Sequence, residues 1–238
     1  VQLPETLAGF QQFWSQRDQP HRLSGVWRFH ELLPFASADQ IVTLGEGQTI
    51  LQQADWVAQF VGIQPAGLYL QYEGMNPSGS FKDNGMTAAF THARSIGATQ
   101  AACASTGNLA NSVAANAASA GLDAIVFIPA DLEKGKILNS LIYGARVVAI
   151  RGHYDEVNRL CAEIAGNYGW AFVNINMRPY YSEGSKTLAY EVAEQLGWRA
   201  PKHAVVPGAS GSMFTKIWKG LNEFANLGFI DPVETSMH

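Results

Sequence analysis

The residues with the clearest chemical potential lie in one short segment, Glu73–Gly85, which reads EGMNPSGSFKDNG. An apolar run, Leu68–Tyr72, precedes this segment, and a helical pattern, Asp83–Ile96, follows it. A junction between a strand and a helix presents side chains and free backbone N–H groups at the carboxyl end of a sheet, where open α/β folds bind ligands. Lys82 lies at the start of the expected helix, within this junction.

Lys82 is a candidate nucleophile. The positive end of a helix dipole and partial burial both disfavour an ammonium group and so favour the neutral amine. A neutral amine can attack a carbonyl group and form a Schiff base. Most lysines are solvated surface residues, and Lys82 could be one of them on an ordinary loop. Its neighbours Ser80, Phe81 and Asp83, in a turn that contains Gly and Pro, favour the chemical interpretation.

Two further segments combine the end of an expected strand with the start of an expected helix. The first is Ser105–Asn108 (STGN) and the second is Pro207–Ser212 (PGASGS). Free N–H groups at a helix start bind anions, and glycines allow several such groups to converge. The first segment could simply cap a helix, and the second could be a plain connection. Capping would explain one residue of the first segment rather than four, and the order of the three segments favours a shared site.

These three segments resemble those of the fold-type II family of pyridoxal-phosphate enzymes. In that family, a run of the form Asn-Pro-(Ser/Thr)-Gly-Ser-(Phe/Tyr)-Lys carries the cofactor as a Schiff base, and Asn76–Lys82 matches it. The resemblance implies that Lys82 bonds to pyridoxal 5'-phosphate and that Asn108 binds the 3'-oxygen of the cofactor. It also implies that backbone donors of Ser105, Thr106 and Gly107 bind the substrate carboxylate. The donors implied for the cofactor phosphate are those of Gly208, Ala209, Ser210, Gly211 and Ser212.

Within this family the sequence is most similar to threonine synthases. The similarity rests on Leu44–Gly47 (LGEG), Phe81–Asp83 (FKD) and Glu183–Thr187 (EGSKT), and it extends from Val42 onward. It implies a lyase of threonine biosynthesis, which converts O-phospho-L-homoserine and water to L-threonine and phosphate by γ-elimination and β-addition. A related threonine or serine dehydratase and an inactive cofactor-binding fragment stay open as alternatives. Asp83 argues against the dehydratases, which favour a basic or small residue there.

The resemblance also implies a site for the phosphate group of the substrate. Multiple or charged donors bind a phosphate dianion best. The candidate donors are Ser80, Thr106, Asn174, Arg178 and Lys186. Arg178 could instead be a surface residue, and Lys186 could pair with Glu183 or Glu191 on a helix face.

The apolar pattern predicts a parallel α/β fold from about residue 68 onward, because short apolar runs alternate with amphipathic stretches. The expected strands are Leu68–Tyr72, Ala101–Ala104, Ala124–Ile128, Arg146–Ile150, Ala171–Val173 and His203–Val206. Two short amphipathic pieces lie at Leu7–Arg17 and Val26–Leu33. The expected helices are Asp83–Ile96, Leu109–Ala120, Glu133–Tyr143, Tyr154–Tyr168, Lys186–Leu196 and Ser212–Asn226. Five of them end at a glycine, which supplies a left-handed C-terminal turn.

The resemblance implies parallel sheets in two domains, with the active site in the cleft between them. We expect an N-terminal arm at 1–45, a large cofactor-binding domain at 46–84 and 175–238, and a small substrate-side domain at 85–174. Threonine synthases continue well past the position of His238, so we expect a C-terminally truncated chain with an incomplete large domain. The family often forms homodimers, and the N-terminal arm is the expected contact.

Composition and charge exclude several classes of protein. The chain is 47% hydrophobic and 15% charged, as in globular proteins. Its 16 basic and 20 acidic residues are scattered, so no basic stripe is present and nucleic acid is not an expected partner. No apolar window approaches the ~18–20 residues of a membrane span. The two cysteines, Cys103 and Cys161, suit a reducing compartment, and we expect a cytoplasmic protein without a metal site.

Overall fold

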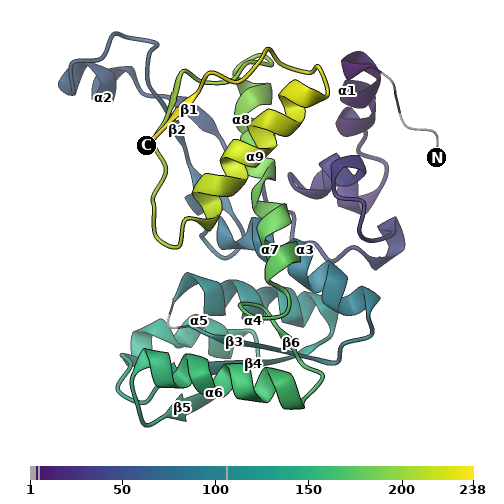
Figure 1. The fold of residues 1–238 in the computed structure, drawn as a ribbon, viewed down its shortest axis with the longest axis vertical. Coiled ribbons are helices and arrows are strands. Elements are labelled where there is room, and N and C mark those ends of the chain that lie inside the picture. The colour runs from purple at the N-terminus through teal and green to yellow at the C-terminus, as the bar shows by residue number, and fades with distance from the viewer. Residues whose placement is uncertain (1–3, 5, 106) are drawn as a thin grey trace.

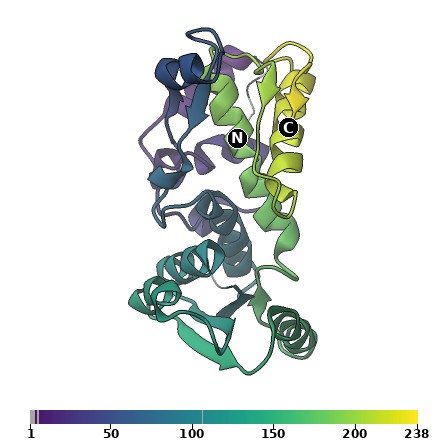
Figure 2. The ribbon, with the colours of Figure 1, turned by 90° about the vertical axis from the view of Figure 1, so that its left-hand side faces the viewer.

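The computed structural model describes residues 4, 6–105 and 107–238. Thr106, one of the predicted substrate-binding residues, lies outside the described residues. Figure 1 shows two lobes stacked along the long axis of the molecule, and Figure 2 shows the same arrangement from the side. The lower lobe contains the four-stranded sheet, and the upper lobe contains the N-terminal and C-terminal helices with two small sheets. Helices α3 (Lys82–Ser95) and α7 (Arg178–Ser185) lie where the lobes meet.

The lower lobe is built on a parallel sheet with the strand order β5-β4-β3-β6. Its strands are β3 (Gln100–Ala104), β4 (Asp123–Pro129), β5 (Arg146–Ile150) and β6 (Ala171–Phe172). Its helices are α4 (Asn108–Ala120), α5 (Leu138–Ile142) and α6 (Tyr154–Asn167), with a 3-10 turn at Lys134–Lys136. The predicted parallel α/β class is therefore confirmed.

The central strands are apolar on both faces because helices cover both sides of the sheet. Cys103 and Val126 pack with α3 and α4 in one core cluster, whereas Ala104 and Phe127 pack with α6 in another. Side chains alternate between the two faces of a strand with a period of two, so consecutive residues enter different clusters. This explains why β3 and β4 are continuous apolar runs in the sequence.

The upper lobe has an aromatic core. It lies between α1 (Leu7–Ser15), α8 (Thr187–Gln195) and α9 (Ser212–Asn226). The ring of Phe224 stacks on Tyr190 at a centroid distance of 4.3 Å and on Trp14 at 5.9 Å. The N-terminal segment therefore packs against the body of its own chain. The boundaries of the three predicted domains stay predictions, although β3–β6 all lie within 85–174.

The remaining elements are short. Strand β1 (Leu51–Gln53) pairs antiparallel with β2 (Tyr69–Gln71), and β7 (His203–Ala204) pairs parallel with β8 (Ser236–Met237). Helix α2 (Asp55–Phe60) lies between β1 and β2 in the chain and projects from the upper lobe (Figure 1). The other 3-10 turns are Pro20–Leu23, Trp27–Leu32, Ala38–Gln40 and Glu73–Met75. Within the described part of the chain, no helix combines the length and hydropathy needed to cross a membrane.

Two predicted helices differ from the observed ones. The helix expected at Glu133–Tyr143 is a 3-10 turn, Lys134–Lys136, followed by the short α5, and Gly135 in that turn disfavours a continuous α-helix. The helix expected to begin at Lys186 is preceded by another, α7, where the sequence predicted no regular element. Proline is well tolerated in the first helical turn, where Pro179 lies.

Helices α3 and α7 approach each other so closely that glycine is required at the contact. A Cβ atom on Gly184 of α7 would lie 1.9 Å from the carbonyl oxygen of Asn84. A Cβ atom on Gly85 of α3 would lie 2.3 Å from Cδ2 of Tyr181. Neither position can accept a larger residue unless the two helices separate.

We expect Gly184→Ala to lower the free energy of unfolding by about 1–3 kcal/mol, because the added methyl group overpacks the α3–α7 contact. Gly166→Ala is the matched control, since Gly166 lies in helix α6 and a Cβ atom there would meet no neighbouring element within 4 Å. That change should be neutral or stabilise by up to about 1 kcal/mol. Urea unfolding of both variants measures the difference, and equal stability of Gly184→Ala and the unmodified chain would contradict the close contact.

Candidate active site

Lys82 begins α3 and follows a turn that Asp83 fixes in place. The backbone N–H and the hydroxyl of Ser78 each donate to the Asp83 carboxylate at 2.7 Å. The hydroxyl of Ser112, on α4, donates to the same carboxylate. Asp83 is fully buried, and the backbone N–H of Lys82 donates to the Ser80 hydroxyl at 3.3 Å. One buried carboxylate therefore joins the lysine turn to the helix that follows the Ser105–Asn108 segment.

The amine of Lys82 lies between two aromatic side chains. Its Nζ donates to the Tyr181 hydroxyl at 3.1 Å and lies 4.1 Å from the ring centroid of Phe81. Within the described part of the chain, no carboxylate forms an ion pair with it, in contrast to Lys186. The amine is therefore available for covalent chemistry, with a neutral hydroxyl as its hydrogen-bond partner.

The turn before Lys82 is also held from the upper lobe. The Asn76 side chain accepts from the Gly47 N–H at 2.9 Å and donates to Glu73 Oε2 at 2.9 Å. The next N–H, from Gln48, donates to Glu191 Oε1 at 2.6 Å. Gly47, at the end of the LGEG segment, and the adjacent Gln48 thus connect the lysine turn to α8 through hydrogen bonds.

Glu191 is a buried carboxylate at one end of this network. Burial raises its pKa to about 7, and the nearby carboxylates of Glu73 and Glu194 act in the same direction. The charge of Arg28 and the N–H of Gln48 lower the pKa but do not offset the burial. Its second oxygen has no hydrogen-bond partner among the described residues.

The Ser105–Asn108 segment connects β3 to α4. Ser105 is buried, and its hydroxyl accepts from the Gly107 N–H at 3.4 Å. Asn108 is the first residue of α4 and its side chain is exposed. The free N–H groups of this helix start lie on the same helix as Ser112, which contacts the lysine turn through Asp83.

The Pro207–Ser212 segment connects β7 to α9. Ala209 and Gly211 have positive φ angles of 34° and 73°, and the Gly211 N–H donates to the Gly208 carbonyl at 2.5 Å. Gly208, Ala209 and Ser210 are exposed. Ser212 begins the 15-residue helix α9, whose first N–H groups have no acceptor within the helix. This geometry suits an anion at the helix start.

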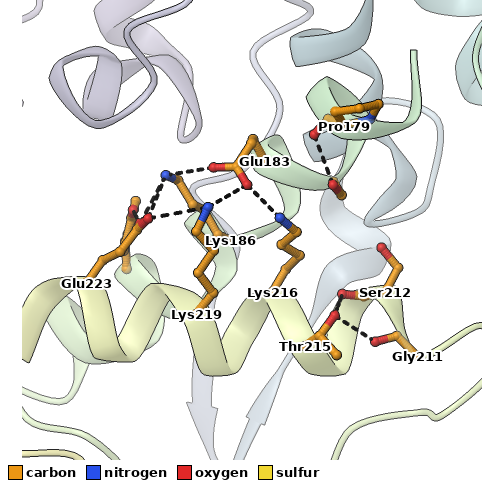
Figure 3. Close-up of polar contacts among 11 residues, drawn as sticks. Pro179, Glu183, Lys186, Gly211, Ser212, Thr215, Lys216, Lys219 and Glu223 are labelled. Carbon is orange, nitrogen blue, oxygen red and sulfur yellow. Dashed lines mark hydrogen bonds and ion pairs between the residues drawn. The ribbon is translucent and has the colours of Figure 1, made fainter. Parts of the chain in front are cut away.

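An ion-pair cluster joins α9 to α7 and α8 (Figure 3). Its members are Glu183, Lys186, Lys216, Lys219 and Glu223. Lys186 is buried, and its Nζ lies 3.0 Å from both Glu183 and Glu223. Of the two alternatives left open by the sequence, the structure therefore contains the pair with Glu183 and not that with Glu191. The role of Lys186 toward the substrate phosphate stays a prediction.

The cluster keeps Glu183 ionised. Burial alone would raise the pKa of Glu183, but hydrogen bonds from Lys216 and Lys219 and the charge of Lys186 lower it to about 2. The carboxylate is therefore charged at any physiological pH. Because Glu183 lies on α7 and Lys216 on α9, the pair fixes the start of α9 relative to the helix that contacts Lys82.

The other predicted phosphate donors lie in different environments. Ser80 is buried and accepts the Lys82 N–H. Asn174 is half-buried, and its side-chain oxygen has no partner among the described residues. Arg178 is exposed at the first residue of α7. The structure thus brings Ser80 to Lys82, leaves Asn174 able to accept a donor, and leaves Arg178 at the surface.

The sequence did not indicate two residues of the site. Tyr181 contacts the Lys82 amine, but no element was expected at its position, and nothing in the sequence distinguished it from Tyr180. Ser112 binds Asp83 from the second turn of α4, and its position in the expected helix Leu109–Ala120 gave no sign of that contact. A helix prediction beginning at Arg178 would have placed Tyr181 and Gly184 on one helix, toward α3.

A cavity of about 160 Å³ adjoins the site. Its lining includes Pro77 and Ser78 from the lysine turn and Asn111 from α4. The other lining residues are Asn139 and Ile142 of α5 and Tyr143, which follows that helix. Lys82 and Asn108 are not among these lining residues. The cavity therefore lies beside the candidate site and does not contain it.

An α/β fold that presents a lysine amine, together with two further junctions at helix starts whose N–H groups suit an anion, fits a class of protein that combines an anion site with a nucleophile. The family model described as pyridoxal-phosphate dependent enzyme matches residues 42–234. This match covers most of the chain and all three segments named above. The chain therefore belongs to the pyridoxal-phosphate dependent enzyme family.

Curated relatives of the chain are threonine synthases. The threonine synthase of Methanocaldococcus jannaschii is 38% identical over 208 residues, which are 87% of this chain and 51% of the relative. That of Methanosarcina acetivorans is 39% identical and covers 87% of this chain and 50% of the relative. That of Mycobacterium tuberculosis is 37% identical and covers 85% and 56%. The chain thus spans about half the length of the curated relatives it matches.

Solved structures support the fold. The apo form of Escherichia coli diaminopropionate ammonia lyase matches with a TM-score of 0.69 at 20% identity, over 95% of this chain and 67% of that protein. Threonine deaminase isoform 2 from Solanum lycopersicum matches with a TM-score of 0.70 at 18% identity, over 89% and 54%. At these identities the likeness shows the fold alone.

The described residues fit pyridoxal 5'-phosphate. An aldehyde group requires an amine outside an ion pair, as Lys82 supplies. A phosphate group requires converging N–H donors, and the positive φ angles of Ala209 and Gly211 turn the backbone before α9 in the manner of such a site. The exposed amide of Asn108 is free to bind a ring oxygen. The roles of the individual residues stay predictions.

We expect Glu191→Gln to remove a pH-dependent loss of stability. The folded chain holds a proton on Glu191 that the unfolded chain releases at the ordinary glutamate pKa, so the free energy of unfolding falls as pH rises from about 5 to about 7. Relative to the unmodified chain, the variant should therefore gain up to roughly 3 kcal/mol between pH 5 and pH 8. Urea unfolding at several pH values measures this difference. A difference that does not change with pH would contradict the raised pKa.

Proposed function

We propose that this chain provides the cofactor-binding part of a threonine synthase, which converts O-phospho-L-homoserine and water to L-threonine and phosphate. The observation that carries the proposal is the 36–39% identity to curated threonine synthases over a stretch that includes the lysine turn and the EGSKT segment. The availability of the Lys82 amine, next to the starts of α3 and α4, supports it independently. Pyridoxal 5'-phosphate, when bound, supplies an electron sink for negative charge at the substrate carbons.

In this proposal, Lys82 holds the cofactor and moves protons at the α and β carbons of the substrate. The starts of α4 and α9 bind anions. Ser105 and Gly107 bind the substrate carboxylate, and residues 208–212 bind the cofactor phosphate. Asn108 binds the ring oxygen. Thr106, assigned with Ser105 and Gly107, lies outside the described residues.

The far-end phosphate of the substrate needs its own donors. We assign Ser80, Asn174, Arg178 and Lys186 to it. The unpartnered oxygen of Asn174 marks a side chain that can rotate its amide nitrogen toward an anion. Lys186 would have to exchange one of its two carboxylate partners for the phosphate, whereas the exposed Arg178 would need only to turn inward.

The proposal includes the division into a large domain, 46–84 and 175–238, and a small domain, 85–174, with the substrate between them. It also includes a homodimer, which the exposed side chains of Trp56 and Phe60 on α2 support as an apolar surface. The buried, unpaired thiols of Cys103 and Cys161 support a reducing compartment such as the cytoplasm.

Product analysis tests the proposal in the purified chain and in any longer natural polypeptide that contains it. With pyridoxal 5'-phosphate and O-phospho-L-homoserine, we expect equal amounts of phosphate and L-threonine. Lys82→Ala should lower the rate by at least about 10²–10⁴-fold, because it removes both the covalent attachment and the proton carrier. Lys136→Ala is the matched control, since that lysine is 53% exposed, and it should leave the rate unchanged.

Two outcomes would contradict the proposal. Formation of 2-oxobutanoate from L-threonine, without phosphate release from O-phospho-L-homoserine, would identify a dehydratase. Cofactor binding without either reaction, in the longest natural polypeptide, would identify a binding protein.

A further inference from the structure

Tyr181 is the only described residue whose side chain forms a hydrogen bond with the Lys82 amine, yet it belongs to none of the segments that indicated the function. The two residues are 99 positions apart in the sequence, and Nζ lies 3.1 Å from the phenolic oxygen. The same Nζ lies 5.8 Å from the centroid of the Tyr181 ring. The contact is therefore made by the hydroxyl at the edge of the ring, and the amine does not lie over its face.

The backbone of α3 and α7 leaves this tyrosine little freedom. Gly85 follows Lys82 by three residues on the same face of α3, and a Cβ atom there would lie 2.3 Å from the Tyr181 ring. Gly184 follows Tyr181 by three residues on α7 and makes the reciprocal close approach to Asn84. The Tyr181 ring thus lies in the space that Gly85 leaves open, and Gly184 allows the backbone of α3 to approach α7 closely.

The neighbouring tyrosine has a different environment. Tyr180 stacks on His92 at a centroid distance of 3.4 Å and contacts Phe35 edge-on at 5.4 Å. Consecutive residues on a helix point about 100° apart, so the register of α7 directs only one of the two phenols toward Lys82. The pair therefore provides a natural comparison within one helical turn.

The chemical nature of the partner matters for the amine. A carboxylate at this position would form an ion pair with the amine, as Glu183 and Glu223 do with Lys186. A neutral phenol accepts an N–H without adding a charge, so it fixes the direction of the amine by a hydrogen bond alone. The side chain of lysine has four rotatable bonds, and one hydrogen bond at its end restricts the directions in which the nitrogen lone pair can point.

We propose that Tyr181 is a positioning residue that orients the Lys82 amine toward an aldehyde carbon in the site. The proposal rests on the proposed cofactor chemistry at Lys82. In the step that it assists, the amine nitrogen forms a bond with the aldehyde carbon, and the aldehyde oxygen leaves as water with the two protons of the neutral amine. Tyr181 donates and accepts hydrogen bonds during this step but loses no atom.

The test measures the rate of covalent capture at Lys82. The chain is mixed with pyridoxal 5'-phosphate, samples are reduced with borohydride at successive times, and the modified Lys82 peptide is quantified by mass spectrometry. We expect Tyr181→Phe to slow capture about tenfold, which is the upper range for loss of one hydrogen bond. Tyr180→Phe, which removes the neighbouring hydroxyl, should capture at the rate of the unmodified chain.

A second substitution separates orientation by the hydroxyl from packing by the ring. Tyr181→Leu removes both the hydroxyl and the ring, whereas Tyr181→Phe keeps the ring over Gly85. If the hydroxyl orients the amine, the two variants are slowed to a similar extent. If the ring merely packs, Tyr181→Phe captures at the unmodified rate and only Tyr181→Leu is slow, which overturns the proposal. Urea unfolding of each variant establishes that it is folded under the conditions of capture.

The same experiment distinguishes failure of this proposal from failure of the proposed function. Capture at Lys82 in the unmodified chain, abolished by Lys82→Ala and unaffected by Tyr181→Phe, contradicts the role of Tyr181 alone. Absence of capture at Lys82 in the unmodified chain contradicts the cofactor chemistry itself, and the role of Tyr181 fails with it.

Discussion

The crossing of α3 and α7 determines where the reactive amine lies relative to everything else in the molecule. The two helices come from distant parts of the sequence and meet where the lobes join. Their approach is closer than any side chain would allow at Gly85 and Gly184, so the contact depends on two missing Cβ atoms. The start of α3 supplies Lys82, and α7 leads directly into α8 and the upper lobe. Widening this crossing would move the amine away from the Tyr181 hydroxyl.

Electrostatic interactions extend that constraint to the neighbouring elements. Asp83 binds the lysine turn and α4 at once, which relates the Ser105–Asn108 segment to Lys82. Glu183 and Lys216 relate the start of α9 to α7 in the same way (Figure 3). Both carboxylates are surrounded by donors, so neither is left as an uncompensated buried charge. Glu191 differs because one of its oxygens lacks a partner among the described residues, and its burial raises its pKa to about 7.

Much of the fold could be predicted because the lower lobe obeys local rules. The strands of the sheet are apolar on both faces, and glycines end several helices, so β3, β4, β5, α4 and α6 lie within a few residues of their predicted positions. The upper lobe was harder to predict. Strand β1 is a polar LQQ segment without alternation, and β8 is only two residues long, so neither carries a strand signal. Pairing with distant residues, which the local sequence does not encode, creates both strands.

The candidate site likewise contains some residues that the sequence could indicate and others that it could not. Lys82, Asn108 and the glycine loop could be identified from their sequence because each lies at a junction between a strand and a helix. The contact between Lys82 and Tyr181 depends on the register of one helix against another, and the partner of Lys186 depends on which of two nearby glutamates the tertiary structure presents. These contacts depend on how residues that are distant in the sequence pack together. For this reason the sequence left Glu183 and Glu191 as alternatives and gave no sign of Tyr181.

The most direct test of the account is a diffraction structure of the chain crystallised with pyridoxal 5'-phosphate. We expect electron density that continues from Nζ of Lys82 into the cofactor, with the cofactor phosphate at the start of α9 against the N–H groups of residues 208–212. Density for the cofactor attached to another lysine, or a cofactor phosphate bound away from the start of α9, would contradict it.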